Sequence, residues 1–375
     1  PTQEADRRGG KHNEVYDGRV IKILEEVWEK SYYISSQRLV KAIPLWLPSI
    51  KKHYKLSAED EIKLSNISAA TVDRRLKDKK LSFRKRIYGK TKGAERFWRS
   101  QVPIQTEKPD VKEPGWTEID LVSHSGQSAA GYFAQTVSQT DLLTQWIVRK
   151  AILGKGEIEV CNAIDDMRSK FPFEIKGLDS DNGSEFINGT LIGYCIDENI
   201  YQTRGRAYKK DDQAHIEQNN GANVRKWVGW VRYDTSCAVE SLNDLYDNEL
   251  WILDNLFMPS QRLIKTEYRG STRRRYYDEA KTPLDRLNEY CPNDAKVKEL
   301  LMMRAKLDPI EISIKIENKL RGLEGLSSKT YPKINYNRYK PVNYEPYIQT
   351  FKTQWCPQMT KYRRIWGKEK ALKTW

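Results

Sequence analysis

The chain has 375 residues, and a prior of about 150 residues per domain predicts two or three domains. Its 11 Trp, 21 Tyr and 8 Phe can build cores, which excludes a disordered protein, and no apolar run approaches the roughly 18 residues that a membrane-spanning helix needs. No membrane partner is therefore expected. The 65 basic residues outnumber the 51 acidic ones, giving a formal net charge of +14, which favours nucleic acid as the partner.

The five cysteines are odd in number and far apart, and no two of them form a C-x-x-C pair. This usage argues against a disulfide framework and against a cysteine-rich zinc site, and it fits a reducing cytosol. The first residues of the sequence contain no apolar segment, so no secretory signal is expected in them.

Residues 1–55 are predicted to form an N-terminal helical region. Gly18–Lys30 carries its apolar residues near one helical stripe, which predicts an amphipathic helix. A second helix is expected to begin at Ser35 or Ser36, either of which can cap it, and Pro44 is expected to disrupt its far end.

Residues 56–100 are predicted to contain a helix-turn-helix. Ser57 can cap a first short helix, and Ser68 can cap a second helix that carries Val72 and Leu76 inward. The second helix of such a motif enters the major groove of DNA.

The outward face of that second helix and the basic run after it are the predicted DNA contacts. From Ser68 to Ser100 there are 12 Lys or Arg residues against 3 acidic ones, so DNA binding is favoured over a merely solvated helix. The predicted contacts are Thr71, Arg74, Arg75, Lys77, Arg84, Lys85 and Arg86.

Residues 101–114 contain three prolines and little apolar content, and they are predicted to be a linker. In residues 115–234 strand-like and helical runs alternate in the order βββαβαβα, which predicts a mixed sheet with helices packed on it. The expected strands are Trp116–Val122, Tyr132–Val137, Thr144–Lys150, Phe173–Leu178 and Ile200–Thr203, and the expected helices are Glu157–Lys170, Phe186–Glu198 and Gln213–Val228.

The rest of the chain falls into two predicted segments. Residues 235–328 are expected to be a mainly helical C-terminal region with one basic island at 273–275. Residues 329–375 form a basic tail with 11 basic, 2 acidic and 10 aromatic residues. This tail could bind nucleic acid, wrap around a partner subunit or belong to a folded core.

Three carboxylates stand out by their positions. Asp120 lies inside the apolar first strand, where a buried carboxylate is costly unless it is paired or binds a cation. Asp181 follows a later strand and opens a D-N-G turn, at the sheet edge where sites in α/β folds form. Glu217 lies on a predicted helix, and 35 residues separate it from Asp181. Singly, each could instead be a structural or solvated carboxylate.

With these residues in place, the chain resembles the integrase-type DDE transposases of bacterial insertion sequences, relatives of retroviral integrase. The resemblance rests on Asp120, on D-N-G-S-E-F at 181–186, and on an E-x-x-N helix with Glu217 and Asn220. It also includes T-P-L-D-R-L at 282–287, and it covers roughly residues 55–290.

The resemblance implies an RNase H-like core, a mixed five-stranded sheet with flanking helices. It implies that Asp120, Asp181 and Glu217 hold two divalent cations, normally Mg²⁺ with Mn²⁺ able to substitute, and hard cations do favour such oxygen ligands. The implied activity is Mg²⁺-dependent cleavage at transposon ends followed by 3′-hydroxyl strand transfer into target DNA. Asp179 is the competitor of Asp181 for the second ligand, because both face the same side of the strand.

The implied partners are the double-stranded DNA of the terminal repeats, the target DNA and further copies of this chain, in a bacterial cytoplasm at the nucleoid. Many relatives carry Lys or Arg seven residues after the catalytic Glu, where this chain has Val224. The expected contacts with the DNA end are Lys209, Lys210, Asn220 and Arg225.

The histidines and cysteines distinguish this chain from retroviral integrases, and two alternative functions fit the sequence. The four histidines and the cysteine spacing exclude the zinc domain of retroviral integrases, and His124 and His215 are expected to be structural or phosphate-contacting rather than metal ligands. The alternative functions are a non-catalytic DNA-binding repressor derived from a transposase and an RNase H-like nuclease acting on RNA–DNA hybrids.

Overall fold

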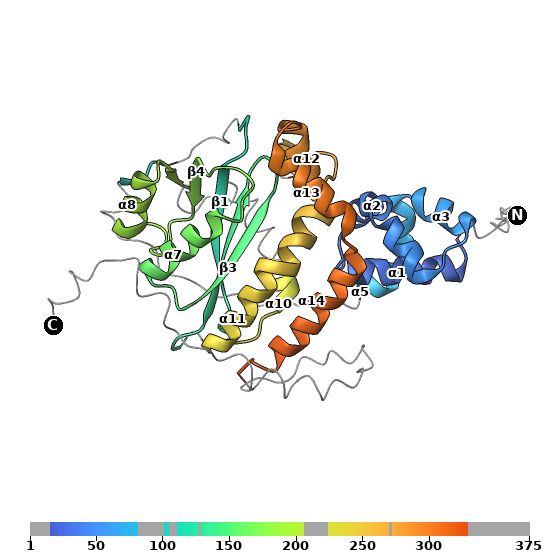
Figure 1. Cartoon of the computed structure of the whole chain (residues 1–375), viewed down its shortest axis with the longest axis horizontal. Coiled ribbons are helices and arrows are strands. Elements are labelled where there is room, and N and C mark those ends of the chain that lie inside the picture. The colour runs from blue at the N-terminus through green and yellow to red at the C-terminus, as the bar shows by residue number, and fades with distance from the viewer. Residues whose placement is uncertain are drawn as a thin grey trace, which may run out of the picture. The chain divides into compact units, whose positions relative to one another are not determined.

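A mixed five-stranded sheet organises the structure, a computed structural model that describes residues 16–81, 101–104, 111–126, 128, 130–205, 224–269 and 272–328. Its strand order is β3-β2-β1-β4-β5 (Figure 1). β1 is antiparallel to β2 and parallel to β4, and β5 is parallel to β4. The strands are β1 (Trp116–Ser123), β2 (Ala134–Asp141), β3 (Ile147–Leu153), β4 (Gly177–Ser180) and β5 (Tyr201–Arg204).

The predicted mixed sheet with flanking helices is confirmed, with shifted boundaries. β4 is shorter than the expected strand Phe173–Leu178 and begins at Gly177, whose N–H donates to the carbonyl of Gly115. The helix expected from Phe186 begins at Gly189, since the Asn188 side chain accepts from the Leu191 N–H and caps it there.

Helices pack on both faces of the sheet. Side chains alternate between faces along a strand, so Lys150 and Ala151 of β3 point in opposite directions. On the face of Lys150, this lysine forms an ion pair with Asp166 of α7. On the face of Ala151, the hydroxyl of Tyr246 bonds Thr136, which is the strand partner of Ala151. The flanking elements are α7 (Glu157–Arg168), α8 (Gly189–Asp197), α10 (Lys226–Val228), α11 (Ser236–Leu245), η2 (Tyr246–Leu250) and η3 (Leu253–Phe257).

The outer edge of the sheet, β3, is closed by two asparagine side chains. Asn243 accepts from the N–H of Ala151 at 2.7 Å and donates to its carbonyl at 2.9 Å. Asn255, fully buried, does the same for Ile147, at 2.9 Å in each direction. The side-chain amides of Asn243 and Asn255 therefore satisfy the outward backbone groups of Ala151 and Ile147, which an edge strand would otherwise leave without a strand partner.

Helices form the N-terminal part of the described chain: α1 (Gly18–Lys30), α2 (Ser36–Tyr54), α3 (Ala58–Ser65), α4 (Ala69–Arg75) and α5 (Lys77–Leu81). The expected caps are confirmed, because Ser57 accepts from the Asp60 N–H and Ser68 from the Thr71 N–H. The expected break at Pro44 is wrong, since α2 continues through Pro44 and Pro48.

The physical reason for the continuous α2 is burial. Ile43, Trp46 and Ile50 are fully or almost fully buried on one face of the helix, and their packing outweighs the hydrogen bonds that two prolines remove. Each proline costs the helix about 3 kcal/mol, whereas each large buried side chain contributes about 1.5–3 kcal/mol.

Residues 235–328 are mainly helical, as expected, and one hairpin is added to the helices. A hairpin of β6 (Leu263–Arg269) and β7 (Thr272–Tyr277) holds the basic island at 273–275. It is followed by α12 (Pro283–Tyr290), α13 (Ala295–Lys306) and α14 (Pro309–Glu324). α14 contacts the N-terminal helices through the ion pair of Glu317 with Lys30 at 2.8 Å.

The segment expected to be a linker contacts the core where it is described. Val102 is buried against Ile187, and Ile104 bridges in parallel to Arg204 of β5. Residues 1–329 group as one compact unit, and the tail after them lies outside the described residues. Within the described ranges, no helix is both long and apolar enough to cross a bilayer.

The asparagine clasp on β3 gives a first prediction. Asn255→Ala leaves the buried N–H and carbonyl of Ile147 without partners, and we expect the free energy of unfolding to fall by about 2–4 kcal/mol in urea denaturation. Asn248→Ala is the matched control, because Asn248 is exposed and its side chain donates to Asp244 four residues earlier, and it should change stability by less than about 0.5 kcal/mol. Equal effects of the two variants would contradict the role of the clasp.

Candidate active site

The parallel pairing of β1 with β4 brings Asp120 and Asp181 together. The ladder pairs Thr117 with Leu178 and Glu118 with Asp179. The ladder ends there; continued by two positions along both chains, the same register leads to Asp120 within β1 and to Asp181, which directly follows β4. Adjacent strands lie about 4.8 Å apart, so this register would place the two aspartates near each other where β4 ends.

The turn at 181–183 is held in a fixed shape. Asp181 Oδ1 accepts from the N–H of Gly183 at 2.7 Å. Asn182 donates to the carbonyl of Gly205 at 2.8 Å and accepts from Arg204 at 2.9 Å, which ties the turn to the end of β5. A Cβ at Gly183 would lie 2.7 Å from Glu185 Cδ and 2.8 Å from Asp181 Oδ1, so any larger residue would force these carboxylates to move.

Glu185 is a further carboxylate near Asp181. It is the glutamate of D-N-G-S-E-F and had no predicted role. It is 6% exposed, and Lys155 Nζ lies 3.8 Å from it. The pKa of Asp181 is raised by burial and by the charge of Glu185, against the lowering effects of the Gly183 N–H and of Lys155. The sequence signal for Glu185 is the motif itself, because an acidic residue four positions after Asp181 can fold back toward it.

Asp141 shows what a purely structural carboxylate looks like in this fold. It is fully buried and accepts from the N–H groups of Gly115, Leu143 and Thr144 and from the Thr144 hydroxyl, at 2.7–3.2 Å. Asp181, by contrast, receives one hydrogen bond on its carboxylate from the described residues. Its remaining oxygen lone pairs suit a hard cation, which takes several oxygen ligands.

Asp179, the competitor of Asp181, lies one step back on the same face. Its Oδ1 accepts from the Thr203 hydroxyl at 2.6 Å, and its strand partner is Glu118, which is 8% exposed. This contact engages Asp179 within the sheet, whereas Asp181 lies at its end. Five acidic residues (Glu118, Asp120, Asp179, Asp181 and Glu185) thus gather along β1, β4 and the turn.

Several predicted site residues lie outside the described residues: Arg84, Lys85, Arg86, Lys209, Lys210, His215, Glu217 and Asn220. The described chain resumes with Val224, which is buried, and Arg225. Arg225 lies near enough to the buried His124, which follows β1, for its charge to add to burial in lowering the pKa of that histidine.

Arg225, predicted to contact the DNA end, is engaged inside the fold. Its guanidinium lies 4.1 Å from the centroid of the Trp230 ring, in a cation–π contact. Burial lowers the pKa of Arg225 to about 10. Its assignment as a DNA contact stays a prediction.

His124 is structural, as expected. It is fully buried, and its Nε2 lies 2.7 Å from the Thr136 hydroxyl, which also bonds Tyr246. Burial, followed by the charge of Arg225, lowers the pKa of His124 to about 3, so the ring is neutral at physiological pH.

The predicted recognition helix, α4, ends at Arg75, and Lys77 is the first residue of α5. Arg74 and Lys77 are exposed, whereas Thr71 and Arg75 are half-buried. Arg74 donates to the Thr71 hydroxyl at 3.2 Å, and Val72 and Leu76 are buried as expected. The surface needed for a DNA contact is present, and the contact itself stays a prediction.

One further group of possible metal ligands lies elsewhere, where His53 of α2 meets Asp308 and Glu311 at the start of α14. Lys52 Nζ lies 2.6 Å from Glu311 and 3.4 Å from Asp308, and His53 bonds Asp308 at 3.0 Å. The lysine already supplies the positive charge, so this group is an ion-pair cluster between two helices.

Comparisons of sequence and of structure find known proteins that are similar to this chain. The chain is 36% identical over 269 residues to "Uncharacterized protein y4rM" of Sinorhizobium fredii (strain NBRC 101917 / NGR234), covering 70% of this chain and 75% of the relative. No protein-family model matches the sequence.

Two solved structures are similar at low identity. The catalytic core domain of BIV integrase is 14% identical with a TM-score of 0.29, covering 47% of this chain and 94% of that one. The catalytic core domain of HTLV-2 integrase, in complex with magnesium, is 13% identical with a TM-score of 0.29, covering 39% and 90%. Because both TM-scores are low, the description of the fold rests on the strand order and register of this chain alone.

The buried His124 predicts a specific pH dependence of stability. An unfolded histidine takes up a proton below about pH 6.5, whereas His124 in the folded protein does so only near pH 3. Between pH 7.5 and 5.5 the unfolded state therefore gains about 1.4 kcal/mol from this residue. We expect His124→Gln to lose that part of the decline in urea denaturation at the two pH values. An unchanged decline in the variant would show that His124 is protonated when folded.

Proposed function

The chain belongs to the family of the Sinorhizobium fredii protein y4rM, and we propose that it is a polynucleotidyl transferase of the DDE type, a DNA transposase. The observation that supports the proposal is the register of β1 with β4, which pairs Glu118 with Asp179 and, continued by two positions, leads to Asp120 and Asp181. The resemblance to integrase-type transposases supplies the third ligand, Glu217.

The carboxylates fit divalent cations. Asp120, Asp181 and Glu217 would hold two Mg²⁺ or Mn²⁺ ions, which when bound stabilise charge on the attacking and leaving oxygens of a displacement at phosphorus. Burial and Glu185 raise the pKa of Asp181, so its charge is costly without a cation nearby. The rigid turn at Gly183 keeps Asp181 at this position without help from the substrate.

The proposed reaction has two steps. Water attacks the phosphorus at the transposon end and the 3′-oxygen leaves, which frees a 3′-hydroxyl. That hydroxyl then attacks a phosphodiester of the target DNA, whose own 3′-oxygen leaves in turn. Each step exchanges one P–O bond for another, so no covalent intermediate between protein and DNA is required.

Recognition of the DNA ends is assigned to α3 and α4. Ser57 and Ser68 cap the two helices, and Val72 fixes α4 on the other helices, which leaves Arg74 and Lys77 exposed for the major groove. Two ends must be joined in one event, so we propose that the protein acts as a homo-oligomer.

A strand-transfer assay tests the proposal. Purified full-length protein is mixed with supercoiled plasmid and a labelled duplex that bears the sequences flanking its gene, with Mg²⁺ or with EDTA. We expect Mg²⁺-dependent joining of the labelled 3′ end to the plasmid. Asp120→Asn, Asp181→Asn and Glu217→Gln should each lower joining by about 1,000-fold or more while end binding persists, since several kcal/mol of charge stabilisation are lost.

Asp197→Asn is the matched control, because Asp197 is an exposed carboxylate at the end of α8. It should join DNA as the unchanged protein does. Retained joining in any one of the three variants would remove that residue from the site. Tight end binding without joining by the unchanged protein would favour the repressor, and cleavage confined to RNA–DNA hybrids would favour the nuclease.

A further inference from the structure

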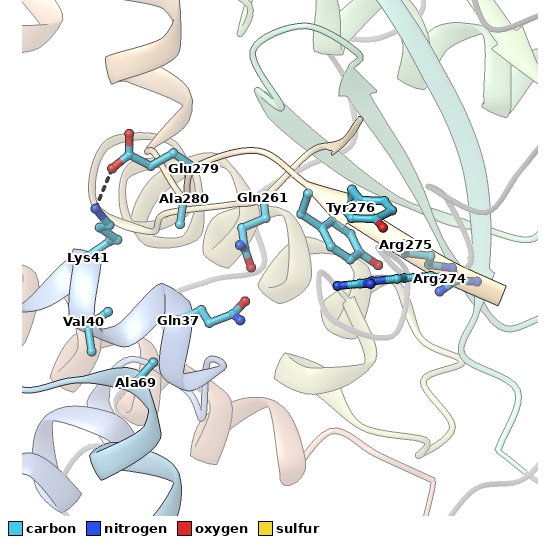
Figure 2. Close-up of a pocket in the computed structure, with 11 residues that line it drawn as sticks. Gln37, Val40, Lys41, Ala69, Gln261, Arg274, Arg275, Tyr276, Glu279 and Ala280 are labelled. Atoms are coloured by element: carbon cyan, nitrogen blue, oxygen red, sulfur yellow. Dashed lines mark hydrogen bonds and ion pairs between the residues drawn. The ribbon is translucent and has the colours of Figure 1, made fainter. Parts of the chain in front are cut away.

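A groove of about 430 Å³ separates α2 from the β6–β7 hairpin (Figure 2). α2 contributes Gln37, Val40 and Lys41, and the N-terminal residue of α4, Ala69, closes one side. The opposite wall carries the basic island that the sequence analysis singled out and the proposed reaction does not use: its lining residues are Gln261, Arg274, Arg275, Tyr276, Tyr277, Glu279 and Ala280.

The groove is positively charged. Glu279 is the one acidic residue in its lining, and Lys41 already pairs with it at 2.5 Å. Arg274 and Arg275 are both exposed, and no ion pair joins either of them to another described residue. Glu267, the strand partner of Arg274, is engaged by Lys265 at 2.8 Å. Both guanidinium groups can therefore bind an anionic ligand, and phosphate accepts paired hydrogen bonds from arginine.

Aromatic rings stand next to these charges. Arg274 lies 5.0 Å from the centroid of the Tyr276 ring, and the Tyr276 hydroxyl donates to Glu267 at 2.9 Å, so both side chains are held in place. Tyr277 keeps 36% of its surface exposed at the groove. Exposed tyrosine beside arginine is the combination on which bases of a single strand stack while their phosphates are neutralised.

The hairpin is anchored at its base. Arg286, from the T-P-L-D-R-L motif, is 4% exposed; it pairs with Asp278 and donates to the carbonyls of Ser260 and Glu279 at 2.8 and 3.1 Å. Lone two-stranded hairpins are marginally stable, so this clamp explains how β7 can present charged side chains in a fixed position. The groove is thereby organised before any ligand arrives.

We infer that this groove binds a single-stranded segment of DNA, with phosphates on Arg274 and Arg275 and a base on Tyr277. The volume accommodates a ligand of nucleotide size, and stacking on the Tyr277 ring needs an unpaired base, which a single strand supplies. Ala69 of α4 lines it, so a strand unpaired next to the bound duplex would reach it directly. The inference rests on the proposed function for the source of the strand.

Fluorescence anisotropy of the full-length protein tests the inference. The probes are a labelled oligo-dT, a forked duplex and a blunt duplex of equal length, each titrated over a range of salt concentrations. Arg274→Gln with Arg275→Gln should weaken binding of oligo-dT and of the forked duplex about 10-fold or more. The slope of log K against log salt should flatten by about 1.4, which corresponds to two phosphate contacts on a single strand. Tyr277→Leu should weaken both about 10-fold with the slope unchanged, because stacking carries no charge.

Lys296→Gln with Lys298→Gln is the matched control, since it removes the same charge from exposed positions of α13 outside the groove. It should leave oligo-dT binding within about twofold. Three outcomes would overturn the inference: the groove variants bind as the unchanged protein does, the control loses as much affinity, or the blunt duplex loses as much as the fork.

Binding and joining fail separately in this design. If the groove variants lose oligo-dT while the unchanged protein joins no DNA, the groove assignment holds and the transposase proposal fails. If Asp181→Asn abolishes joining while the groove variants bind oligo-dT as the unchanged protein does, the transposase proposal holds and the groove assignment fails. Thermal unfolding of each variant should match that of the unchanged protein, because Arg274 and Arg275 are exposed.

Discussion

The candidate active site depends on the parallel hydrogen-bonded pairing of β1 with β4. This pairing joins two segments about 60 residues apart and fixes which carboxylates become neighbours. A slip by one residue would turn Asp120 to the opposite face of the sheet, away from Asp181. Thr117 strengthens the register, since its hydroxyl donates to the carbonyl of Gly177 at 2.8 Å.

Carboxylates in this fold therefore occupy two kinds of environment. Asp141 is surrounded by N–H and hydroxyl donors that satisfy its charge within the protein. Asp181 and Glu185 instead lie close to each other, with Lys155 as the nearby described cation, and burial raises the pKa of Asp181. Accumulated negative charge at one edge is a stability cost that a bound cation would offset.

Much of this arrangement could be predicted from local signals. Gly18–Lys30 was predicted as a helix with the bounds that the structure shows, and Ser57 and Ser68 cap their helices, because these features depend on neighbours in sequence. The positions of Asp120 in a strand and Asp181 at a strand end were likewise readable, whereas Glu217 lies outside the described residues.

The errors come from contacts between distant parts of the chain. Pro44 did not end α2, because burial of the helix face outweighed local preference. The hairpin was missed because its strands are dominated by charged residues, and its clamp by Arg286 is a tertiary contact. The clasp of Asn255 on Ile147 spans 108 positions, a distance over which no sequence pattern indicates pairing.

Both edges of the sheet are occupied by the chain itself. Asn243 and Asn255 engage the backbone of β3, and on the far side the N–H of Arg204 donates to the carbonyl of Pro103. Among the described residues, these contacts use backbone groups of both edge strands that β-augmentation would otherwise need. Two copies that joined their sheets edge to edge would have to displace them, which favours association through helix and side-chain surfaces.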